Sequence, residues 1–259
     1  MEKPSRTVKA KRSGQGDSLF FKGLQDGFPI CVGYLSVSFV FGMLCLESGL
    51  GIGYGLLISA TNLTSAGQFA GLELILAGAP LLEIAITTLV INIRYTLMSL
   101  SLSQKVDARM TTLQRALLSF GNTDEVFAVA MQAENPLSFS YMLGLIATPY
   151  LGWTVGTLLG GTVTSLLPLS LRSALGIAIY GMFIAILVPP AKKLRPVLVT
   201  CVLALALSCA FSYAPWLREL SSGWTIILCA LLAAGFAAWR YPVPVEDAME
   251  NEGEGGEKT

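Results

Sequence analysis

The chain has 259 residues, of which 53% are hydrophobic and only 13% are charged, and its formal net charge is zero. Soluble domains carry about 25% charged residues, so this composition, with a mean hydropathy of +0.64, excludes an ordinary soluble domain. We therefore expect an integral membrane protein that is surrounded by the lipid bilayer and has no nucleic-acid partner.

Six long apolar runs with very little charge follow one another along the chain: 28–46, 82–102, 138–166, 174–190, 194–214 and 222–240. Each approaches or exceeds the ~20 residues that a helix needs to cross about 30 Å of hydrocarbon. The alternating segments of ~10 residues that build a membrane β-barrel are absent. The sequence thus predicts an all-α integral membrane protein with about six to seven transmembrane helices.

The two ends of the chain differ in charge. Residues 1–22 are basic and residues 242–259 are acidic, and both segments have the composition of solvated, disordered tails. The transmembrane domain is predicted to span 23–241. Because no convincing small-residue cleavage site follows the first apolar run near Phe28, we expect a retained helix and not a cleaved signal peptide.

The positions of lysine and arginine predict the orientation in the membrane. Basic residues gather at the N-terminus, at 105–115, at 192–195 and at Arg240, and such residues favour the cytoplasmic side. Both termini are therefore expected to be cytoplasmic. This orientation requires 51–79 to begin and end outside and 109–135 to begin and end inside. We predict that both segments are broken or re-entrant.

The composition of these two segments supports that prediction. Each places polar residues in an apolar background: Thr61, Asn62, Thr64, Ser65, Gly67 and Gln68 in the first, and Gly121, Asn122, Thr123, Asp124 and Glu125 in the second. Irregular backbone at membrane depth survives only where protein covers it or where it lines a watery cavity. Broken helices of this kind build substrate sites in transporters. Ordinary polar loops or surface helices are the alternative.

The five cysteines lie inside apolar runs without C-x-x-C spacing, and the chain has no histidine. Neither a disulfide framework nor a zinc site is expected, and we interpret the cysteines as small buried hydrophobic residues. The sequence contains no G-x-S-x-G, no H-E-x-x-H and no nucleotide-binding P-loop. We therefore expect no metal, no cofactor and no enzymatic activity.

Six motifs occur in the order seen in one known family: GFPICVGYLSVSFVFGMLC at 27–45, SAGQF at 65–69, VINIRYTLMS at 90–99, TDE at 123–125, GWTVGTLLGG at 152–161 and YGMFIAILVPPAK at 180–192. The chain thus resembles the AzlC family, the large permease subunits of bacterial branched-chain amino-acid exporters. The resemblance implies efflux of leucine, isoleucine, valine and sometimes methionine across the cytoplasmic membrane, with a small AzlD-like membrane subunit as partner. The family's Asn-x-Arg motif falls on Asn92 and Arg94, and Tyr95 follows it where other members carry histidine or tyrosine.

Arg94 is the most informative single residue. An arginine near the middle of a transmembrane helix costs roughly 2.5 to 3.5 kcal/mol on insertion scales, so it needs a cavity or an acidic partner. Its planar guanidinium matches a carboxylate with two hydrogen bonds, which suits the α-carboxylate of an amino acid. The alternative is a structural ion pair with Glu83, Asp124 or Glu125, although Glu83 is expected nearer the membrane interface.

The polar residues of the two broken segments complete the candidate site. Asp124 and Glu125 are predicted to be a counter-charge, a contact for the substrate ammonium group, or a proton carrier. Their alternative is a solvated acidic pair on a cytoplasmic loop. Asn62, Thr64 and Gln68 are candidates for neutral hydrogen bonds to a zwitterion, and the alternative is that they only satisfy the broken backbone.

Three glycines at four-residue spacing, Gly152, Gly156 and Gly160, line one face of the helix predicted at 138–166. Such a face lets another helix approach closely. The spacing does not distinguish a neighbour in the same chain from a partner subunit.

Together these features predict a secondary transporter that exports branched-chain amino acids, driven by inward proton movement through Asp124 or Glu125. A channel, or a scaffold subunit without transport of its own, is the alternative, since polar residues also line channel pores. Counterflow of labelled substrate separates a carrier from a scaffold.

Overall fold

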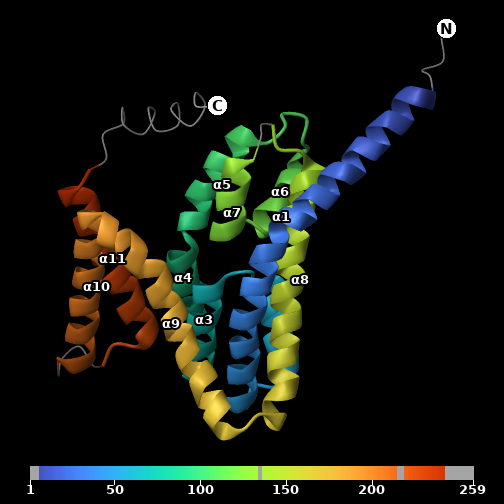
Figure 1. Ribbon diagram of the computed structural model, residues 1–259. Coiled ribbons are helices and arrows are strands. Elements are labelled where there is room, and N and C mark those ends of the chain that lie inside the picture. Colours follow the sequence, from blue (N-terminus) through green and yellow to red (C-terminus); the bar gives the residue numbers. More distant parts are fainter. Residues whose placement is uncertain (1–5, 134–135, 215–218, 243–259) are drawn as a thin grey trace. The chain divides into compact units, whose positions relative to one another are not determined.

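The computed structural model describes residues 6–133, 136–214 and 219–242 (Figure 1). In this part of the chain the fold is helical, and its strand-like pairing is limited to an isolated bridge between Val106 and Leu137. The elements in chain order are α1 (Arg6–Glu47), α2 (Ile52–Thr61), α3 (Ser65–Leu76), α4 (Leu81–Asn92), α5 (Arg94–Lys105), α6 (Thr112–Phe120), α7 (Asp124–Gln132), α8 (Phe139–Val163), the 3-10 turn η1 (Thr164–Leu166), α9 (Leu169–Lys193), α10 (Arg195–Tyr213) and α11 (Ser222–Arg240).

Four described helices are long and apolar enough to cross a membrane: Ser18–Glu47, Phe139–Leu166, Arg195–Tyr213 and Ser222–Arg240. A fifth span results if α4 and α5, which are bent at Ile93, count as one. These five candidate spans correspond to five of the six apolar runs predicted to cross the membrane. The sixth run, 174–190, is also helical and forms part of α9. The all-α membrane fold is therefore confirmed.

Both polar segments are broken helices, as predicted. The first divides into α2 and α3, and the backbone between them is extended at Asn62 and Thr64. The second divides into α6 and α7, and the Thr123 side chain caps the start of α7 by accepting a hydrogen bond from the Val126 amide. Threonine and asparagine compete with the helix for backbone hydrogen bonds, which explains why the breaks fall at these residues.

Two boundaries differ from the sequence prediction. Helix α1 begins at Arg6, so the backbone of residues 6–22 is helical where a disordered tail was expected. No proline lies between Arg6 and the apolar run, and the basic residues there are good helix formers. The run 82–102 contains an additional break at Ile93, which places Arg94 at the start of α5 and not inside a continuous helix. The acidic segment 242–259 lies almost entirely outside the described residues.

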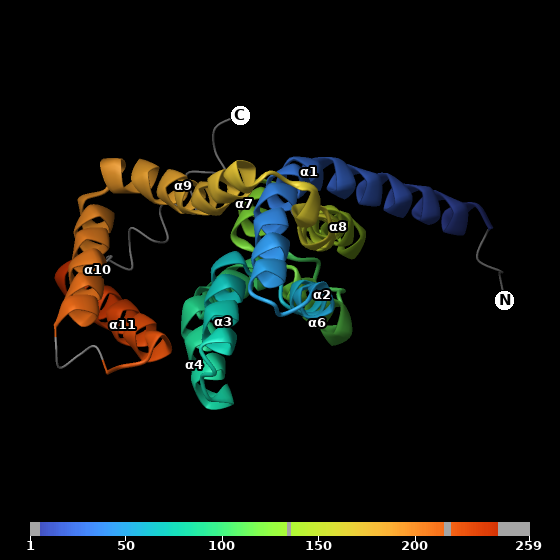
Figure 2. The same cartoon turned by 90° about the horizontal axis from the view of Figure 1, so that it is seen from below.

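The chain separates into two compact units. Unit 1 comprises the described residues of 1–78 and 91–179, and unit 2 comprises those of 79–90 and 180–259. In unit 1, α1 and α8 lie side by side over most of the length of α8 (Figure 1). In unit 2, α10 packs against α11, as the view from below shows (Figure 2).

The α1–α8 contact depends on glycine. A Cβ atom at Gly152 would lie 2.6 Å from Cys31 Sγ, and one at Gly156 would lie 2.5 Å from the Leu35 carbonyl oxygen. Gly160 meets the backbone of Phe39 just as closely. The glycine face predicted from the sequence therefore packs against a helix of the same chain. Successive glycines along α8 contact successive residues along α1, from Cys31 to Phe39. The two helices therefore run in the same direction, which agrees with the expected topology.

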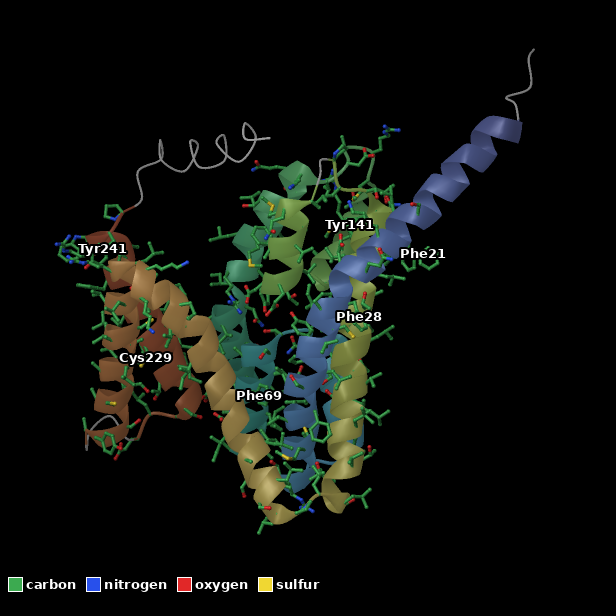
Figure 3. All side chains as sticks on the ribbon, viewed as in Figure 1. Phe21, Phe28, Phe69, Tyr141, Cys229 and Tyr241 are labelled. Carbon is green, nitrogen blue, oxygen red and sulfur yellow. The ribbon has the colours of Figure 1, made fainter. Side chains whose placement is uncertain are left out.

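Hydrogen bonds reinforce the same helix pair. The Tyr141 hydroxyl of α8 donates to Asp26 Oδ2 of α1 at 2.8 Å, and Tyr141 lies beside α1 in Figure 3. A second part of the unit 1 core gathers around α5 to α8, where Leu102, Val126 and Met142 are fully or almost fully buried. This core joins the end of α5 and the start of α7 to α8.

Candidate functional site

Arg94 and Asp124 form an ion pair at the centre of the candidate site in unit 1. Arg94 Nη1 lies 2.7 Å from Asp124 Oδ2, a length typical of a charge-assisted hydrogen bond. Arg94 is the first residue of α5, and Asp124 is the first residue of α7. About half of each side chain is exposed, at 51% and 42%. The pair is therefore accessible to a small polar molecule.

Tyr34 links α1 to the next carboxylate. Its hydroxyl lies 2.7 Å from Thr123 Oγ1 and also donates to Glu125 Oε2. Its ring packs edge to face on Trp153 of α8, with 5.2 Å between the ring centroids. The sequence prediction missed Tyr34, because a single tyrosine in an apolar run is also typical of a residue at the membrane interface. The clue is that it lies inside the first family motif, at 27–45.

The Asn-x-Arg motif holds the start of α3. Thr64 Oγ1 donates to Asn92 Oδ1 at 2.7 Å, and the Tyr95 hydroxyl donates to Thr64 Oγ1 over a longer 3.4 Å. The Arg94 guanidinium also lies 5.1 Å from the centroid of the Tyr95 ring, within the range of a cation–π contact. Tyr95 therefore positions Arg94 as well as Thr64.

Gln68 belongs to a buried network beside this motif. Its Nε2 donates to Ser59 Oγ at 2.8 Å, and its Oε1 accepts from Trp153 Nε1 at 3.1 Å. Ser59 in turn lies 2.7 Å from Thr157 Oγ1. With both ends of its amide bonded, Gln68 ties the broken pair α2 and α3 to α8. Asn62, the third candidate of this segment besides Gln68 and Thr64, makes no side-chain hydrogen bond to the residues that the structure describes.

The starts of three helices, α3, α5 and α7, contribute to the site. A helix start carries partial positive charge and free N–H groups, and this explains why Asp124 and Glu125 are favourable in the first turn of α7. At the start of α3 the Thr64 hydroxyl bonds to Asn92 instead of capping its own helix. The neighbouring Ser65 Oγ is buried and has no hydrogen-bond partner among the described residues.

Glu83 does not take part in the Arg94 ion pair. It lies in the first turn of α4 and is only 6% exposed, inside unit 2. The Ser221 hydroxyl of the same unit donates to Glu83 Oε1. Of the three acidic partners considered for Arg94, the structure selects Asp124.

The fold and this site define a class: a multi-helix membrane protein in which broken helices surround an ion pair. The family model described as "AzlC protein" matches residues 29–167, which include Tyr34, Arg94, Asp124 and Glu125. That match covers more than half of the chain. The chain belongs to the AzlC family.

The relatives that match the chain are described as membrane proteins. The chain is 28% identical over 201 residues to the inner membrane protein YgaZ of Escherichia coli strain K12, covering 74% of this chain and 82% of YgaZ. It is 34% identical over 178 residues to an uncharacterized membrane protein of Archaeoglobus fulgidus, covering 68% of this chain and 77% of that protein. A Helicobacter pylori strain J99 membrane protein is 30% identical over 155 residues, 56% of this chain and 66% of its own length. No solved structure matches the chain.

Proposed function

We propose that this protein is the large subunit of a secondary transporter that exports branched-chain amino acids across the cytoplasmic membrane. Its substrates are leucine, isoleucine and valine, with methionine as a further candidate. It works with a small AzlD-like membrane subunit, and both of its termini are cytoplasmic. Family membership supports the transport class, and the resemblance described above motivates the substrate and the partner.

The observation that carries the proposal is the half-exposed Arg94–Asp124 pair. An amino-acid zwitterion has the same two charges in one molecule, so its carboxylate can bind the Arg94 guanidinium while its ammonium group binds Asp124. Insertion of the substrate then exchanges one ion pair for two and leaves no charge unpaired. The side chains are 51% and 42% exposed, so a small molecule can reach both charges. Asn92 accepts a hydrogen bond from Thr64 at the start of α3, and the Tyr95 ring lies against the Arg94 guanidinium.

Proton coupling is assigned to the neighbouring carboxylate, Glu125. Its oxygen accepts from the Tyr34 hydroxyl, and Thr123 shares that contact. Protonation of Glu125 would weaken this charged hydrogen bond and free α1 from the start of α7. The sequence has no P-loop for ATP hydrolysis, so an ion gradient is the energy source that fits the chain.

The proposal is tested with inverted membrane vesicles that contain this protein with and without the small partner. Because export corresponds to uptake into inverted vesicles, an acidic lumen should drive accumulation of labelled leucine, and an uncoupler should abolish it. Accumulation that is insensitive to the uncoupler contradicts proton coupling. A complex that neither accumulates leucine nor exchanges labelled for unlabelled leucine fits the channel or scaffold alternative and contradicts transport.

A further inference from the structure

Trp153 of α8 is the largest fully buried side chain among the described residues, with only 1% of it exposed. The mechanism above does not use it. The indole N–H can only donate a hydrogen bond, and Nε1 donates to Gln68 Oε1 of α3 at 3.1 Å. The indole ring packs edge to face on Tyr34 of α1, with 5.2 Å between the ring centroids. Trp153 therefore contacts α3 on one side and α1 on the other.

The bond from Trp153 to Gln68 belongs to a closed ring of hydrogen bonds. Gln68 Nε2 donates to Ser59 Oγ at 2.8 Å, and Ser59 Oγ lies 2.7 Å from Thr157 Oγ1. The Thr157 hydroxyl donates to the backbone carbonyl of Trp153 at 3.1 Å, so the Ser59 hydroxyl is the donor to Thr157. All four residues are at most 1% exposed. Because each buried member needs the next one as its acceptor, the ring joins α2, α3 and α8 rigidly.

On the side of α3, contacts lead from this ring to Arg94. Gln68 lies one helical turn after Thr64, the residue before the start of α3. Thr64 Oγ1 donates to Asn92 Oδ1 at 2.7 Å and accepts from the Tyr95 hydroxyl at 3.4 Å. Asn92 and Tyr95 flank the start of α5, and the Tyr95 ring lies 5.1 Å from the Arg94 guanidinium. The position of Gln68 therefore affects the residues that hold Arg94.

On the side of α1, contacts lead from Trp153 to Asp124. The Tyr34 hydroxyl lies 2.7 Å from Thr123 Oγ1 and donates to Glu125 Oε2. Thr123 and Glu125 flank Asp124, the first residue of α7. Because the Tyr34 ring rests on Trp153, the position of Trp153 affects the residues that hold Asp124.

We propose that Trp153 is a positioning residue that keeps Arg94 and Asp124 in place when a substrate separates their direct ion pair. The inference rests on the proposed function, in which the two charges of an amino acid replace that contact. The direct pair then no longer joins α5 to α7. The second route, through Gln68, Trp153 and Tyr34, stays intact and holds the two charges at the separation that a zwitterion needs. A site that is held in place binds its ligand at a smaller entropic cost.

Leucine counterflow in proteoliposomes that contain the full-length protein and the small partner tests this role. Trp153→Phe keeps an aromatic ring but has no N–H group for Gln68. We expect the leucine concentration for half-maximal exchange to rise roughly three- to tenfold, as for the loss of one hydrogen bond, at a nearly constant maximal rate. Trp224→Phe, at an exposed tryptophan of α11, is the matched control and should behave as wild type. A purely structural role would instead lower the maximal rate at an unchanged half-saturating concentration, and that result overturns the proposal.

Gln68→Met removes the acceptor and keeps the indole, so it tests the same link where Trp153→Phe does not fold. It should also raise the half-saturating leucine concentration, and an unchanged value contradicts the proposal. The double variant Trp153→Phe with Gln68→Met should raise that concentration no further than Gln68→Met alone, because both changes act on one bond. Tyr150→Phe removes a bond from α8 to the Ala60 carbonyl, outside the ring, and should leave the value unchanged.

Thermal unfolding of the same variants separates a failure of this inference from a failure of the export function, because a melting temperature needs no substrate. We expect the double variant to melt no lower than Gln68→Met. A loss in the double variant that equals the sum of the two single losses shows that Trp153 and Gln68 act independently, and this overturns the inference. Wild type that exchanges no leucine but keeps the coupling between the two residues contradicts the export function and not the link through Trp153.

Discussion

Arg94 Nη1 and Asp124 Oδ2 lie 2.7 Å apart and join the first residues of two helices, α5 and α7. Their side chains remain half exposed, so a small molecule can reach the pair. We therefore interpret the pair as a binding site, at which the two charges of an amino-acid zwitterion can replace the contact between Arg94 and Asp124.

Replacement of Arg94 by lysine separates charge from geometry. Arg94→Lys keeps the positive charge but loses the planar fork that binds a carboxylate with two hydrogen bonds. We expect normal membrane insertion, a thermal stability within about 1 kcal/mol of wild type, and a large loss of leucine export. Arg109→Lys, in an exposed pair with Asp107, is the control and should export normally. Normal export by Arg94→Lys would show that charge alone is sufficient.

Tyr34→Phe tests the assignment of Glu125 to proton coupling. The variant keeps the ring on Trp153 and loses only the hydroxyl that contacts Thr123 and Glu125. Loss of a hydrogen bond to a charged group costs about 1.5–3 kcal/mol when the group is well buried, and less at the exposed Glu125. We expect leucine exchange to persist while accumulation driven by a proton gradient falls. The exposed Tyr54 supplies the control, Tyr54→Phe. Equal losses of exchange and accumulation would argue against a coupling role.

Gly156→Ala tests the parallel packing of α1 against α8. The added methyl group would overlap Leu35 and Ser38 of α1, and overpacking of this kind costs about 1–3 kcal/mol. We expect a clear fall in melting temperature. Gly33→Ala places a methyl group on α1 where nothing lies within 4 Å, and it should be neutral or slightly stabilising. If the two variants melt alike, the close approach at Gly156 is absent.

The topology can be mapped with single cysteines in a chain from which the five natural cysteines have been removed. Asp107→Cys and Leu194→Cys lie at two of the basic loops, which should face the cytoplasm. A thiol reagent that cannot cross membranes should label both from the cytoplasmic side. Labelling from opposite sides would refute the predicted orientation.

Sequence patterns predicted the elements that depend on local chemistry. The two helix breaks fall at Asn62, Thr64 and Thr123, residue types that compete with a helix for backbone hydrogen bonds. The Thr64 side chain bonds to Asn92, and that of Thr123 bonds to the Val126 amide. The glycine face of α8 was also visible, because its spacing is a property of one helix. What it packs against had to come from the structure.

The pairings that depend on tertiary structure were not predictable to the same degree. Three acids were possible partners of Arg94, and only the folded arrangement of α5 and α7 selects Asp124. Glu83 lies near the start of an apolar run, and the sequence alone does not show that another segment covers it. Its burial is caused by Ser221 and Gly223, far away in sequence. Apart from its place in the first family motif, Tyr34 had no signal that distinguishes it from a tyrosine at the membrane surface.

The central claim is that Arg94 and Asp124 hold the two charges of an amino acid. Counterflow of labelled leucine in proteoliposomes, with the small partner present, tests it most directly when wild type is compared with the double variant Arg94→Gln with Asp124→Asn. Since that variant leaves neither charge unpaired, we expect it to fold with near wild-type stability. Wild type should exchange leucine and the double variant should not. Full exchange by the double variant would show that the pair is structural and that the substrate binds elsewhere.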